Sequence, residues 1–100
     1  MATTPEGKVK KRVRQVLDSL GAYYVMPVTG GYGNSGAPDF LVCLRGKFIG
    51  IETKAGKGKT TLLQDMNLDR IRKAEGHALV VRETDVESLD TFAQTLLDLV

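Results

Sequence analysis

Asp39, Glu52 and Lys54 are the residues whose types and spacing point most directly to chemistry. If Arg45 and Gly46 are the two central residues of a hairpin turn, counting outward along both strands places Asp39 opposite Glu52. Opposed residues of an antiparallel pair have Cβ atoms about 4.5–5.5 Å apart on one face, where like charges repel. The register therefore predicts a protonated acid or a bridging cation, and carboxylate oxygens favour Mg²⁺ or Mn²⁺.

Lys54 follows Glu52 by two residues, so in a strand both side chains point to the same face, about 6.6–6.8 Å apart. A lysine beside a metal ion can orient or deprotonate a water molecule, or stabilise charge on a phosphate. The Thr53 side chain is expected on the other face, with its backbone carbonyl still available as a metal ligand. Two alternatives remain open: an ordinary exposed salt bridge between Glu52 and Lys54, or a three-residue turn that would shift the register and separate the acids.

Two further polar residues are candidates for the same site. Glu6 projects beside the apolar face of the first expected helix, where it is either a site carboxylate or a first-turn acid that favours the helix dipole. Gln64 stands three residues after Thr61, which is the spacing of a capping box. His77, the sole histidine, has no second histidine to join, and we expect no catalytic role for it.

The composition fits a single domain spanning residues 1–100, with 42% hydrophobic and 26% charged residues. No apolar run approaches the roughly 18 residues of a membrane span, and the first residues lack the apolar core of a signal peptide. We therefore expect a cytoplasmic protein without a membrane partner. Cys43 is the only cysteine, which excludes an internal disulfide, and its place in an apolar run predicts a buried thiol.

The formal net charge of +2 hides an asymmetry, because residues 1–59 carry a net charge of +6 and residues 60–100 a net charge of −4. A basic first half favours an anionic partner such as nucleic acid, although a solvated helix surface would have the same composition. Five basic residues are candidates for contacts with DNA phosphates: Lys8, Lys11, Arg12, Lys57 and Lys59.

The sequence pattern predicts, in order, a helix, three strands, a helix, a strand and a helix. The first helix has Thr4 as its N-cap, Pro5 at its first position and Gly21 as its end. A glycine-rich loop follows the first strand, and its Tyr32 is either a base-stacking residue or an ordinary loop residue. The second helix is expected from Thr61 to the glycine at position 76, with an apolar stripe of Leu62, Leu63, Met66, Ile71 and Ala74. The strands are expected at residues 23–28, 39–44, 47–54 and 78–81, and the last helix from about residue 86.

These residues resemble the PD-(D/E)XK nuclease superfamily, whose signature here is Pro38-Asp39 followed by Glu52-Thr53-Lys54. The order of elements is similar to that superfamily's αβββαβ core, an α/β fold with a mixed sheet flanked by helices, here with an added C-terminal helix. Within it, the chain resembles the virus-type replication-repair nuclease (VRR-NUC) family. That resemblance rests on Glu6, on the Gly-Ala-Pro-Asp segment at 36–39, on Glu-x-Lys, and on a Gly/Lys-rich turn before Gln64. Leu68 stands where related exonucleases often carry tyrosine, which argues against a processive exonuclease.

The resemblance implies roles for these residues. Asp39, Glu52 and the Thr53 carbonyl would bind the metal ion, with Glu6 acting directly or through water. Lys54 would activate or position the attacking water, and Gln64 would steady this lysine or the scissile phosphate. Stand-alone members of the family form homodimers and cleave branched DNA, including four-way (Holliday) junctions, which associates them with DNA repair.

Our leading hypothesis is therefore a structure-selective DNA endonuclease that hydrolyses phosphodiester bonds with Mg²⁺ or Mn²⁺. A nuclease acting on flaps or DNA ends would carry the same motifs. A non-catalytic DNA-binding module would explain the basic first half but has no use for facing carboxylates. A purely structural role as a dimer subunit would not explain why the first helix is basic.

Overall fold

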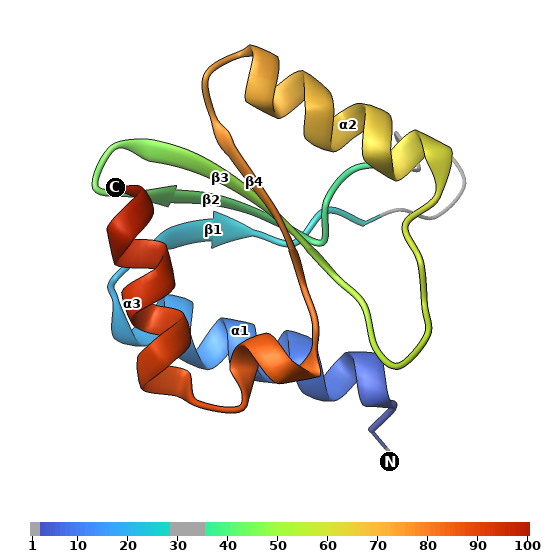
Figure 1. The fold of residues 1–100 in the computed structure, drawn as a ribbon. Helices are drawn as coiled ribbons and strands as arrows, with labels where there is room; N and C mark the ends of the chain where they lie inside the picture. The colour runs from blue at the N-terminus through green and yellow to red at the C-terminus, as the bar shows by residue number, and fades with distance from the viewer. Residues whose placement is uncertain (1–2, 29–35) are drawn as a thin grey trace.

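The computed structural model describes residues 3–28 and 36–100, and the glycine-rich segment that contains Tyr32 lies outside the described residues. The helices and strands follow the expected order, with one 3₁₀ helix added before the last α-helix (Figure 1). The elements are α1 (Pro5–Ser19), β1 (Tyr23–Val25), β2 (Phe40–Leu44), β3 (Lys47–Thr53), α2 (Leu62–Lys73), β4 (His77–Val81), η1 (Glu83–Val86) and α3 (Leu89–Leu99).

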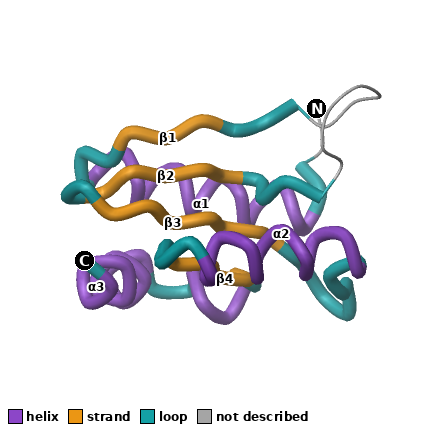
Figure 2. The backbone as a smooth tube through the Cα atoms, turned by 90° about the horizontal axis from the view of Figure 1, so that it is seen from above, coloured by secondary structure: helices purple, strands orange, loops and turns teal. Residues whose placement is uncertain are grey.

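The four strands form one mixed sheet in the order β1-β2-β3-β4 (Figure 2). β1 pairs antiparallel with β2 and β2 with β3, whereas β4 runs parallel to β3 after the chain has crossed over through α2. With α1 and α3 on one face and α2 on the other, this is the α/β core of the PD-(D/E)XK type expected from the sequence, with its additional C-terminal helix.

The β2–β3 hairpin has the register predicted from a two-residue turn, with Leu44 opposite Lys47. Arg45 and Gly46 both adopt positive φ, at 50° and 78°. Positive φ at both central residues is the geometry of a type I′ turn, whose twist matches that of the flanking strands. Asp39 comes one residue before β2 and Glu52 lies near the end of β3, so the hairpin carries both acids to its open end.

The main core lies between the sheet and the pair α1 and α3. The Thr4 hydroxyl accepts a hydrogen bond from the Gly7 N–H at 3.0 Å, which starts α1 and fixes the face that it presents. α3 begins at Leu89 after its N-cap Ser88, three residues later than expected, because η1 takes up Val86. The buried core side chains are those of Val9, Val13, Val16, Leu17, Phe40, Val42, Leu44, Ile49, Ile51, Val81, Val86, Phe92 and Leu96.

The expected apolar stripe of α2 is wrong. Leu68 is the only buried residue of this helix, whereas Leu62 and Met66 are 78% and 52% exposed. α2 packs closely on β3 through Ile71, whose Cδ1 would lie 2.6 Å from a Cβ atom added at Gly50. The helix meets the sheet where the strand has no side chain, so few apolar residues are needed to cover it.

α2 also ends earlier than expected. It stops at Lys73, and Glu75 takes a φ of 69° that a glycine would adopt more easily. Hydrogen bonds from Glu75 N–H to the Arg72 carbonyl and from Gly76 N–H to the Ile71 carbonyl close the last turn as a Schellman motif.

The expectation of a buried Cys43 is wrong, because this thiol is exposed. Cys43 pairs with Tyr23 on one side and Phe48 on the other, and these two side chains are 75% and 45% exposed. This row lies on the face of the sheet that α2 covers only in part, whereas alternate residues such as Val42 point into the main core. None of the helices described is long and apolar enough to traverse a bilayer.

Candidate metal centre

The Asp39 carboxylate is held in place by Thr53, the residue that follows Glu52. One of its oxygens, Oδ2, accepts hydrogen bonds from the Thr53 N–H at 2.8 Å and from the Thr53 hydroxyl at 2.6 Å. The strand alternation placed the Thr53 side chain on the opposite face from the acids. It reaches Asp39 because Asp39 precedes the first paired residue of β2, where its carboxylate can turn around the strand end. Both hydrogen bonds from Thr53 thus go to Oδ2, and Oδ1 takes no part in them.

Glu52 is only 2% exposed, and its two oxygens have different surroundings. Oε2 accepts a hydrogen bond from Gln64 Nε2 at 3.1 Å and lies 3.4 Å from the Lys54 ammonium. Oε1 is buried and has no hydrogen-bond partner among the described residues. Burial, and then the nearby Asp39 carboxylate, raise the pKa of Glu52 to about 7, and the Lys54 ammonium opposes them.

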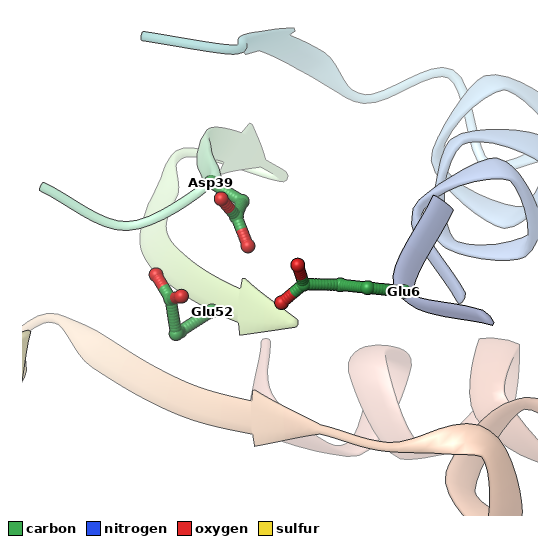
Figure 3. Close-up of side chains that lie close together, drawn as sticks. All are labelled: Glu6, Asp39 and Glu52. Carbon is green, nitrogen blue, oxygen red and sulfur yellow. The ribbon is translucent and has the colours of Figure 1, made fainter. Parts of the chain in front are cut away.

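Glu6 completes a cluster of three acids. One carboxylate oxygen from each of Glu6, Asp39 and Glu52 can be chosen so that all three lie within 4.8 Å of one another. Figure 3 shows Glu6 reaching from the first turn of α1 toward Asp39, with Glu52 approaching from β3. The helix cap at Thr4 sets this position, because it determines where the first turn of α1 begins.

Lys54 and Gln64 both touch the acid cluster. The Lys54 side chain is only 14% exposed, so its pair with Glu52 is not the exposed salt bridge that was the alternative. Gln64 forms the capping box with Thr61, since its Oε1 accepts from the Thr61 N–H at 2.9 Å. Its Nε2 is therefore oriented toward Glu52, and the structural role and the contact with the site coexist in one side chain.

The donor set fits a hard divalent cation. Three carboxylates meet, and one buried oxygen has no partner, which is costly unless a cation or a proton satisfies it. The N–H and C=O of one strand residue point to the same side. Because the Thr53 N–H points to Asp39 while the Lys54 N–H bonds to Val81 of β4, the Thr53 carbonyl lies on the side of the acids.

The basic residues predicted to contact DNA lie in two places. Lys59, in the exposed turn before α2 that also holds Lys57, lines the same open hollow as Glu6 and Lys54. The other three basic residues lie on the side of α1 roughly opposite Glu6 and line hollows beside η1 and α3: Lys8, Lys11 and Arg12.

Sequence reasoning missed two contributors to the site. The Lys10 ammonium lies 3.6 Å from Asp39 Oδ1, and the signal for it was its place one helical turn after Glu6. The Gly56 N–H is shared between the two carboxylate oxygens of Glu83, at 3.1 and 2.9 Å. A hydrogen bond from its own backbone N–H, and then the one from Gly56, lower the pKa of Glu83. This contact connects the lysine-bearing turn to the start of η1, and no sequence pattern indicated it.

The mixed sheet, the flanking helices and the acids at the open end of the hairpin define a nuclease core of the PD-(D/E)XK type. The chain is similar to a solved structure described as a VRR_NUC domain, with a TM-score of 0.72 and 30% sequence identity. The match covers 95% of this chain and 96% of the other. The chain therefore belongs to the VRR-NUC family. No family model matches the sequence, and a search of curated proteins finds no significant match.

Proposed function

We propose that this chain is a single nuclease domain that cleaves DNA with Mg²⁺ or Mn²⁺ bound by Glu6, Asp39 and Glu52. The observation that carries the proposal is the buried, unpartnered Oε1 of Glu52 beside two further carboxylates. A pure DNA-binding surface gains nothing from three acids held together, since they repel both one another and a phosphate. A divalent cation offsets this repulsion and turns the cluster into a site for phosphate.

The bound cation would polarise the scissile phosphate and lower the pKa of a water molecule. The chain's own residues would prepare this chemistry. Thr53 holds Asp39 by two hydrogen bonds, and its carbonyl would add a neutral ligand. Lys54, fixed against Glu52, would orient the attacking water or stabilise the charge that develops on the phosphate. Gln64 would keep the Glu52 carboxylate turned so that Oε1 faces the cation.

The basic residues suggest how DNA would lie. Lys57 and Lys59 would contact phosphates next to the cleaved bond, because their turn borders the hollow that holds Lys54. The α1 residues Lys8, Lys11 and Arg12 would contact a more distant part of the backbone. In a plot of the logarithm of DNA affinity against the logarithm of salt concentration, each phosphate contact makes the slope more negative by about 0.9.

Branched DNA, including four-way junctions, is the substrate that we propose, together with a homodimeric assembly. Two symmetric sites in a dimer would cut two strands related by the symmetry of a junction. This part of the proposal rests on the family. Light scattering after size-exclusion chromatography tests the dimer, for which a mass near twice 10.9 kDa is expected.

The test is cleavage of labelled four-way junctions, flaps, nicked duplexes and linear duplexes with Mn²⁺, with Mg²⁺ and with chelator. We expect metal-dependent cutting of the junction, lost in Asp39→Asn and in Lys54→Met. Lys47→Met is the matched control, because Lys47 is an exposed lysine at the start of β3, whereas Lys54 directly follows the end of this strand. Cutting that survives in both site variants would refute the proposed chemistry, and junction binding without cutting would favour the non-catalytic module.

A further inference from the structure

Lys10 approaches the acid cluster from α1. Its ammonium lies 3.6 Å from Asp39 Oδ1, and its side chain is 35% exposed. Nothing in the proposed function uses this residue. Among the described residues, it is the one basic side chain in an ion pair with Asp39.

The hydrogen bonds of the acids show which oxygens remain for a cation. Thr53 donates twice to Asp39 Oδ2, so Oδ1 is the Asp39 oxygen left to bind a metal ion. In Glu52 the same division holds, since Oε2 is the oxygen that Gln64 and Lys54 contact and Oε1 is free. Lys54 therefore pairs with Glu52 Oε2, which already accepts a hydrogen bond from Gln64. Lys10 instead pairs with Asp39 Oδ1, the oxygen that a metal ion would need.

We propose that Lys10 is a displaceable counter-ion of the metal centre, which pairs with Asp39 Oδ1 in the metal-free protein and leaves it when a divalent cation binds. Its distance exceeds the roughly 2.7–2.9 Å of a strong charge-assisted hydrogen bond, and its flexible stem is partly in solvent, so it can move away. Lys10 then weakens metal binding in two ways, because its own pair with Asp39 must break and because two cations repel. This inference rests on the proposed metal centre.

The test is the affinity for Mn²⁺ alone, measured by isothermal titration calorimetry without DNA. We expect Lys10→Met and Lys10→Gln to bind Mn²⁺ about three- to tenfold more tightly than wild type, the range for a partly screened charge a few ångströms from the ion. Lys10→Arg keeps the charge and is expected to bind no more tightly than wild type. Arg14→Met is the control, because it removes one positive charge from the exposed surface of α1, one turn farther along the helix.

Tighter binding cannot result from a damaged fold, which would weaken metal affinity. Equal or weaker Mn²⁺ binding in both neutral variants, with unfolding temperatures like that of wild type, would overturn the role of Lys10 and leave the metal centre intact. An equal gain in Arg14→Met would also overturn it, since the effect would then be general electrostatics. A wild-type chain that takes up no Mn²⁺ would refute the metal centre and this inference together.

Discussion

Replacing Glu52 with glutamine should stabilise the metal-free protein at pH 8. The carboxyl is buried beside Asp39, and its pKa rises from its ordinary 4.5 to about 7. Between these two pH values the unfolded chain loses the proton that the folded chain keeps. Stability of the metal-free wild type should therefore fall as pH rises through this window and level off above pH 7. At about 1.4 kcal/mol for each tenfold change in proton affinity, the loss is about 3 kcal/mol.

The assay is thermal unfolding in chelator at several pH values between 5 and 8. For a domain of this size, 1 kcal/mol shifts the unfolding temperature by about 4–8 °C, so the wild type should lose more than about 10 °C across the range. Glu52→Gln has no carboxyl to ionise and should lack this fall. Saturating Mn²⁺ at pH 8 should restore the stability of wild type and leave the variant unchanged. A flat wild-type profile, or the same fall in both proteins, would refute the reasoning.

Three other substitutions test the support of the site and the fold. Thr53→Val removes a hydroxyl that donates to Asp39 at 2.6 Å, and we expect about 1–3 kcal/mol of destabilisation and weaker Mn²⁺ binding by calorimetry; unchanged affinity would contradict this. Gly36→Ala would place a Cβ 2.6 Å from the Leu63 carbonyl, so either α2 or the backbone at position 36 must shift; we expect about 1–3 kcal/mol lost in urea unfolding, and an unaltered midpoint would argue against this contact. Glu75→Gly relieves a φ of 69° and should raise stability by about 0.5–1 kcal/mol in the same assay, whereas a loss would show that the position is not strained.

The hairpin and its acids could be predicted because turn chemistry determines register. Arg45-Gly46 accepts positive φ at both positions, so the pairing and the convergence of Asp39 with Glu52 follow from local sequence. The helix order follows in the same way from caps and glycines. These features depend on neighbours within a few residues, which the sequence displays directly.

The sequence could not predict which face of each helix and strand is covered or how deeply the site is buried, because both depend on tertiary packing. Periodicity does not reveal that α2 rests on Gly50, and the exposure of Leu62 follows from that contact. Alternation places Cys43 on one face but does not say whether a helix covers it. The spacing of Lys10 one helical turn after Glu6 indicates a shared helix face, but its approach to Asp39 also requires α1 to cross the sheet at one particular position.

An anomalous difference map from crystals soaked in Mn²⁺ is the most direct test of the metal centre. We predict a peak among the three acids, about 2.0–2.6 Å from Glu52 Oε1 and Asp39 Oδ1, the range of hard divalent cations. A map with no peak there, or a peak bound only by other groups, would contradict the account.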